Sequence, residues 1–180
     1  MLTRFNRLLQ TFLEWFVIIL MIGLTVVVIV AVLFRLSGNS LSWYDEVAAI
    51  FLSWITYYGA ALAALKRRHI GFDSVLLAIP MPLRMWALAL AEAIVFGFFI
   101  LMAWAGMVVL EVLEGEYLVS LTWVPIQVTQ SVIPIGACLF ILCQALSLPF
   151  YWQMTARGIS LEHAEIEEEV ETEMKKAGQA

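Results

Sequence analysis

Long apolar runs, separated by short polar stretches, dominate the pattern along the chain. A helix needs about 20 mostly apolar residues to cross the hydrocarbon core of a bilayer. Four runs reach that length, at residues 15–34, 43–65, 83–110 and 121–151. Pro134 lies inside the fourth run and removes a backbone hydrogen bond, so we expect a local bend there. The pattern therefore predicts an all-α membrane protein with four transmembrane helices.

The composition agrees with this interpretation and excludes other classes. Hydrophobic residues make up 63% of the chain and charged residues 14%, which lies outside the range of soluble globular domains. No basic stripe is long enough to follow a phosphate backbone, so nucleic-acid binding has no support. The net charge of -5 comes mainly from acids between residues 162 and 173. We expect a lipid-embedded four-helix domain over residues 1–152 and an acidic cytoplasmic tail over residues 153–180.

Basic residues in the connections set the expected orientation. They gather before the first apolar run and between the second and third runs, whereas the other two connections hold only Arg35. The gathered residues are Arg4, Arg7, Lys66, Arg67, Arg68 and Arg84. Because Lys and Arg are enriched in cytoplasmic connections, both termini are expected in the cytoplasm. The acidic stretch 111–116 and the turn 37–42 are then expected on the outer side.

The connection between the second and third runs is itself partly apolar. Its apolar residues are Ile70, Phe72, Val75, Leu76, Leu77 and Ile79. An apolar segment beside a basic flank is typical of a short helix that lies in the membrane interface, with Asp73 or Ser74 near its N-cap. We therefore expect a cytoplasmic interfacial helix between the second and third spans.

Glu92 is the clearest charged residue inside an expected span, about 13 Å from the start of that span at the helical rise. Burying an ionised side chain in a membrane costs at least about 2.5–3.5 kcal/mol, so such a residue needs a partner or a function. Thr56, Tyr57 and Tyr58 lie at a similar depth on the second span. We expect Glu92 to bond one of their hydroxyls, or a partner subunit, and to lock a helix contact. An ion-translocating carboxylate is the alternative, although its span offers no second polar group.

Asp45 and Glu46 open the second span and allow two interpretations. Ser42 could cap the helix while the two acids favour its positive N-terminal end. Alternatively, Glu46 faces a partner, together with Trp43 and Trp54, which recur on one face near the helical period. Further along this span, small residues occur in pairs that let another helix approach closely. These small residues are Gly59, Ala60, Ala63 and Ala64.

Enzyme chemistry finds no support in the residue types. Haem anchoring needs histidines within the spans, but His69 and His163 both lie outside them. Cys138 and Cys143 sit in one apolar segment without metal-ligand spacing, so we expect both in the core. Phosphate-binding loops and catalytic triads are also missing. The sequence predicts neither a catalytic site nor a cofactor.

Residues 41–73 resemble the small membrane subunit (DctQ-like) of tripartite ATP-independent periplasmic (TRAP) transporters. The resemblance rests on the order and spacing of residues over about 40 positions, and the proline-basic segment 80–84 also fits it. The residues that carry it are Trp43, Glu46, Trp54, Gly59, Ala60, Lys66, Arg67, Arg68, His69, Ile70 and Asp73.

The resemblance implies a non-catalytic scaffold subunit in a bacterial inner membrane. Such a subunit binds a large polytopic subunit, which carries substrate and sodium, and helps to dock a periplasmic substrate-binding protein. The transport it implies is sodium-driven symport of organic acids, with no cofactor in this chain. The residues that it implies as structural or partner-facing are Trp43, Glu46, Trp54, Gly59 and His69.

Two other classes remain as alternatives. A small homo-oligomeric channel or exporter would transport without another subunit. A membrane-anchor subunit of a respiratory enzyme would bind quinone or haem, and the missing intramembrane histidines count against haem.

Overall fold

The computed structural model describes residues 2–67 and 79–158 and is all-helical over these ranges. Four of its helical segments are long and apolar enough to cross a membrane, which confirms the predicted spans. Outside the helices, these ranges contain a single antiparallel bridge between Tyr117 and Pro125 and no strand. The helices are α1 (Leu2–Leu36), α2 (Tyr44–Lys66), α4 (Met81–Val112), α5 (Ile126–Gln130) and α6 (Val132–Arg157). The helix predicted within residues 70–79 lies almost wholly outside the described ranges.

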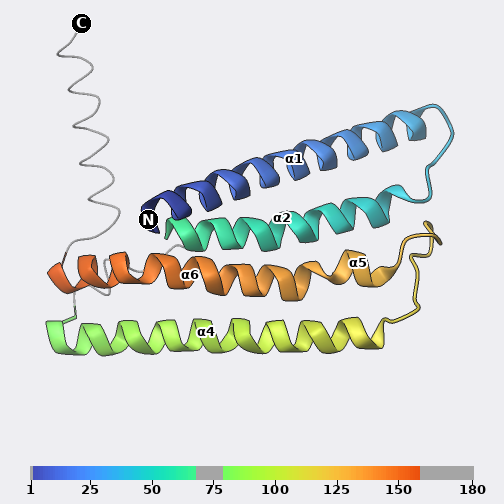
Figure 1. Cartoon of the computed structure of the whole chain (residues 1–180). Helices are drawn as coiled ribbons and strands as arrows, with labels where there is room; N and C mark the ends of the chain where they lie inside the picture. The colour runs from blue at the N-terminus through green and yellow to red at the C-terminus, as the bar shows by residue number, and fades with distance from the viewer. Residues whose placement is uncertain (1, 68–78, 159–180) are drawn as a thin grey trace, which may run out of the picture.

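The long helices lie side by side in the order α1, α2, α6, α4, so chain neighbours are not always neighbours in space (Figure 1). Helix α6 packs against both α2 and α4, and α1 packs against α2. In the most apolar stretch of the fourth span 44% of the residues are buried, whereas the corresponding stretches of the other three spans have only 6–11% of their residues buried. The span formed by α5 and α6 is therefore the centre of the molecule, and the others leave broad apolar faces uncovered.

The fourth span is interrupted where the sequence predicts a bend. Helix α5 ends at Gln130, and α6 begins at Val132 after a turn at Ser131. Pro134 has no N–H to donate to the carbonyl of Gln130 four residues earlier, which explains an interruption at this place. Helical structure begins at Ile126 rather than at residue 121, since residues 121–125 belong to the preceding connection.

Glycines bring α6 close to both of its neighbours. A Cβ atom added to Gly136 would lie 2.6 Å from the Cβ of Tyr57 on α2. A Cβ added to Gly106 on α4 would lie 2.9 Å from Cδ of Pro134 on α6. Both distances are too short for real side-chain contacts, so the two interfaces require residues without a Cβ at these positions.

The apolar core lies where the helices meet around α6. Leu13 of α1, Ala64 of α2 and Cys143 of α6 are fully buried. Phe99 of α4 stacks on Phe140 of α6 with ring centroids 3.6 Å apart. The prediction that both cysteines lie in the core holds for Cys143 but is wrong for Cys138, which is on the uncovered face of α6.

Candidate functional site

Polar side chains from three helices meet around Arg67 at the end of α2. The Arg67 guanidinium forms an ion pair with Glu92 of α4, and its Nε donates to the Ser147 hydroxyl of α6 at 2.8 Å. The Gln144 Nε2 donates to the other Glu92 carboxylate oxygen at 2.7 Å. The Arg67 guanidinium carbon also lies 4.7 Å from the ring centre of Tyr151. These five residues form the Arg67 cluster, which ties α2 and α4 to α6.

The backbone conformation of Arg67 explains how a residue at a helix end enters this cluster. Arg67 follows the last residue of α2 and adopts the left-handed region, with φ of 53° and ψ of 25°. Its N–H donates to the carbonyl of Ala64 at 3.2 Å and closes the last turn. A non-glycine residue in this region costs about 1 kcal/mol or more. The contacts of the guanidinium with its partners offset that cost.

Glu92 contacts Arg67 at the end of α2 and Gln144 of α6 rather than the hydroxyl groups that the sequence suggested as partners. The side chains of Glu92 and Arg67 are each 10% exposed, and Glu92 points into the molecule. Thr56, one of the expected partners, donates instead to the carbonyl of Leu52 on its own helix. The sequence did offer Gln144 as a partner for Glu92, because an amide in the middle of an apolar run also needs a polar partner.

The Arg67 cluster fixes charge in place. Both carboxylate oxygens of Glu92 accept hydrogen bonds, and the Arg67 guanidinium has partners on α4 and α6. A charge held by a counter-charge and by hydrogen bonds on neighbouring helices stabilises one helix arrangement. In the described ranges no group of three or more His, Cys, Asp or Glu side chains could hold a metal ion. The geometry therefore fits a lock between helices.

Glu46 anchors the connection between α4 and α5 at the opposite end of the molecule. One carboxylate oxygen accepts the N–H of Val119 at 3.1 Å, and the other accepts the N–H of Ser120 at 2.9 Å. The Ser120 hydroxyl donates to the carbonyl of Ser42 at 3.0 Å. The prediction that Ser42 caps α2 is wrong, since the N-cap is Trp43 and no side chain caps it. Sequence spacing could not reveal the bonds of Glu46 to Val119 and Ser120, because the bonded residues are more than 70 positions apart in the chain.

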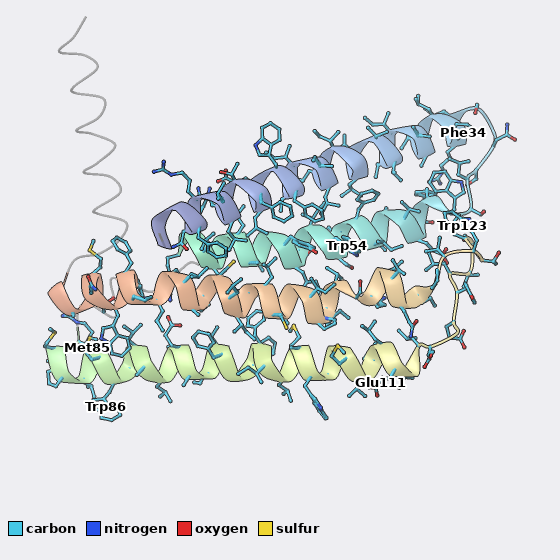
Figure 2. The ribbon with its side chains drawn as sticks, in the orientation of Figure 1. Phe34, Trp54, Met85, Trp86, Glu111 and Trp123 are labelled. Carbon is cyan, nitrogen blue, oxygen red and sulfur yellow. The ribbon has the colours of Figure 1, made fainter. Side chains whose placement is uncertain are left out.

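Trp54 connects α2 to the interruption of the fourth span. Its Nε1 donates to the carbonyl of Thr129 at 3.1 Å, just before the turn at Ser131. In Figure 2 Trp54 lies on α2 beside the central span. The rings of Phe16 and Tyr58 lie 6.5 Å and 6.1 Å from that of Trp54. A backbone carbonyl left without a helical donor needs another one inside a membrane, and Trp54 supplies it.

The remaining predicted residues have different surroundings. A Cβ added to Gly59 would meet nothing within 4 Å among the described residues, so this glycine serves no close contact within residues 2–67 and 79–158. His69 lies outside the described residues. A further ion pair, between residues more than 50 positions apart in the chain, joins Lys66 of α2 to Glu14 of α1. Glu14 also accepts a hydrogen bond from Gln10 of its own helix, and its ion pair with Lys66 ties the first half of α1 to the end of α2.

The family of this chain follows from its match to a known family model. The family model described as "Tripartite ATP-independent periplasmic transporters, DctQ component" matches residues 24–149. The chain belongs to the DctQ family of small TRAP transporter membrane subunits. The match confirms the resemblance seen in the sequence, and its range includes Glu46 and every residue of the Arg67 cluster except Tyr151. No curated protein shows a significant match to the chain.

As a DctQ protein, the chain is a multi-pass component of a transporter. Family membership implies association with a large TRAP membrane subunit and a substrate-binding protein. The geometry adds that helix positions within this DctQ chain are fixed by polar contacts at both ends. The Arg67 cluster holds one end, and Glu46 holds the connection at the other.

Proposed function

We propose that this DctQ chain is a non-catalytic scaffold that binds and stabilises the large transport subunit in the bacterial inner membrane. The observation that carries the proposal is the family match over residues 24–149. The fixed helix arrangement supports it, because a scaffold must present the same surface throughout a transport cycle. The broad uncovered faces of α1 and α4 provide room for a larger membrane partner (Figure 1).

The proposed orientation places the Arg67 end in the cytoplasm, with both termini on that side. Arg7, Lys66 and Arg84 lie toward this end, and positive residues favour the cytoplasmic side of a membrane. The opposite end carries Asp45, Glu46, Glu111, Glu114 and Glu116. In this orientation the interfacial helix predicted between α2 and α4 would rest on the cytoplasmic surface, and the acidic tail predicted over residues 153–180 would lie on the same side.

The acidic end would then face the periplasm and help to dock the substrate-binding protein. Glu46 supports this role by holding the backbone of Val119 and Ser120, which gives the connection between α4 and α5 a defined shape. Tyr117, Val119 and Trp123 on this connection are largely exposed. A shaped connection with exposed apolar residues beside acids is suited to a protein contact.

Transport would be sodium-driven uptake of an organic acid, with sodium and substrate bound by the large subunit. The geometry of this chain is consistent with that division of labour. Glu92, the charged residue buried deepest in the span of α4, is engaged by Arg67 and Gln144 rather than facing an open path. The chain itself would need no cofactor.

Reconstitution into liposomes tests the proposed function. The large subunit, the binding protein and a panel of labelled organic acids are combined with an inward sodium gradient, with and without this chain. We expect uptake of at least one acid only when all three proteins and the gradient are present, and none with this chain alone. The control replaces sodium with potassium on both sides. Uptake by this chain alone would contradict a scaffold role and favour the channel alternative.

A further inference from the structure

A small polar pocket opens between α2 and the region around α5. Its volume is about 190 Å³, and its polar lining comes from Glu46, Ser53, Thr129 and Gln130. Ala49 contributes an apolar part of its wall. We call this cavity the Glu46 pocket. It lies beside the Trp54 bond to Thr129, so its walls are held by contacts within the chain.

The pocket extends along a segment that crosses the membrane. Ser53 follows the start of α2 by nine residues, which corresponds to about 14 Å along the helix. Ser53 and Gln130 both have exposed side chains in the chain by itself. Lipid tails cannot bond polar side chains, and polar groups gathered within a span indicate a partner or a function. We therefore expect the pocket to hold a polar group of another molecule, which enters from within the plane of the membrane.

The charge of the pocket indicates the sign of that occupant. Glu46 accepts two backbone N–H groups, but neither ion pair among the described residues includes it. The described part of the chain therefore forms no ion pair with the Glu46 carboxylate. Nearby acids add to the negative potential, and Arg35 is the one basic residue described at this end. A positive group would complement this potential.

We propose that the Glu46 pocket receives a Lys or Arg side chain from a helix of the large membrane subunit. The proposal rests on the proposed function, because it assumes that this chain binds such a subunit. A basic side chain on a neighbouring helix reaches the pocket laterally, and its head group can bond the carboxylate of Glu46. Ser53 lies seven residues, or about 10 Å, further along α2 and lines the path of the stem. This long apolar stem suits the walls contributed by Ala49.

A charge test uses two substitutions at Gln130. Gln130→Lys puts a positive group inside the pocket, where it pairs with Glu46 and repels the incoming side chain. Gln130→Glu has similar size but increases the attraction. Each variant is co-expressed with the large subunit, and the amount of large subunit recovered per tagged chain is measured in mild detergent. We expect a loss of about tenfold or more for Gln130→Lys, as for other disrupted buried charge pairs, and no loss for Gln130→Glu.

A filling test uses Ser53→Leu, with Thr56→Leu as its matched control. Ser53 lines the pocket, whereas Thr56 is exposed on the same helix and does not line it. Leucine at either position suits lipid, so both variants should fold and run as the wild type does in size-exclusion chromatography. We expect Ser53→Leu to reduce recovery of the large subunit and Thr56→Leu to leave it unchanged.

A photoreactive amino acid at position 53 identifies the occupant directly. We expect irradiated membranes to give an adduct of this chain with the large subunit, and a lipid-only adduct would overturn the proposal. Normal recovery of the large subunit with both Gln130→Lys and Ser53→Leu would also overturn it while leaving the scaffold role intact. Failure of the wild-type chain to recover any large subunit would instead refute the proposed function.

Discussion

Glu92→Leu is expected to destabilise the chain more than the removal of both charges of the ion pair. In the wild type the Glu92 carboxylate neutralises Arg67, and both side chains are 10% exposed. The single substitution leaves the guanidinium without its counter-charge and the Gln144 Nε2 without its acceptor. The double variant Arg67→Met/Glu92→Leu removes both charges and keeps apolar side chains of similar length.

The magnitude follows from the contacts of the pair. Breaking a buried ion pair by removing one partner costs about 3–5 kcal/mol, whereas replacing both partners with apolar groups is often near neutral. Arg67 ends α2, and its long side chain can turn toward water once Glu92 is lost, so we expect about 2–3 kcal/mol for Glu92→Leu. The double variant loses the Arg67 bonds to Ser147 and Gln144 and should cost about 1 kcal/mol.

The assay is a double-mutant cycle in mixed detergent micelles. Unfolding of the wild type, both single variants and the double variant is followed by circular dichroism as the fraction of denaturing detergent increases. We expect a coupling free energy of at least about 2 kcal/mol between Arg67 and Glu92. Single-variant effects that add to within about 0.5 kcal/mol would refute the conclusion that the pair locks the helices.

Further predictions concern the close contacts of the central span. Gly136→Ala should destabilise the chain by about 1–3 kcal/mol through overpacking against Tyr57, because the added Cβ would lie 2.6 Å from the Cβ of Tyr57. Gly59→Ala is the matched control and should stabilise α2 by up to about 1 kcal/mol, since its Cβ meets nothing. Equal thermal shifts for the two variants would contradict this packing. Trp54→Phe keeps an aromatic ring but leaves the Thr129 carbonyl without its donor, which should cost about 0.6–1.7 kcal/mol; an unchanged midpoint of detergent unfolding would argue against that role.

The four spans could be predicted from sequence because length and hydrophobicity decide whether a helix crosses a membrane. The interruption before Pro134 was predictable for a similarly local reason, the missing N–H of proline. The order of the helices in space was not predictable. Because the spans are apolar on nearly every side, the sequence does not mark which face of α2 or α4 meets α6. Chain neighbours α2 and α4 are consequently joined through the central span.

The candidate site shows the same limit. The sequence predicted that Glu92 needs a polar partner, because the cost of a buried charge does not depend on the fold. It could not identify Arg67, which reaches Glu92 only through a left-handed backbone conformation at the end of α2. Glu46 was a candidate from the sequence, but its bonds to the N–H groups of Val119 and Ser120 depend on a distant connection. Backbone donors carry no signature in sequence, so such bonds remain hidden until the fold is known.

Affinity capture of the tagged wild-type chain from native membranes, followed by mass spectrometry, tests most directly whether this DctQ protein is a scaffold. The membranes are solubilised in mild detergent, and an unrelated tagged four-helix membrane protein is the control. We predict recovery of one polytopic membrane protein, larger than this chain and absent from the control, in a constant ratio to the tagged chain. Recovery of the chain alone, as a homo-oligomer, would contradict the scaffold role.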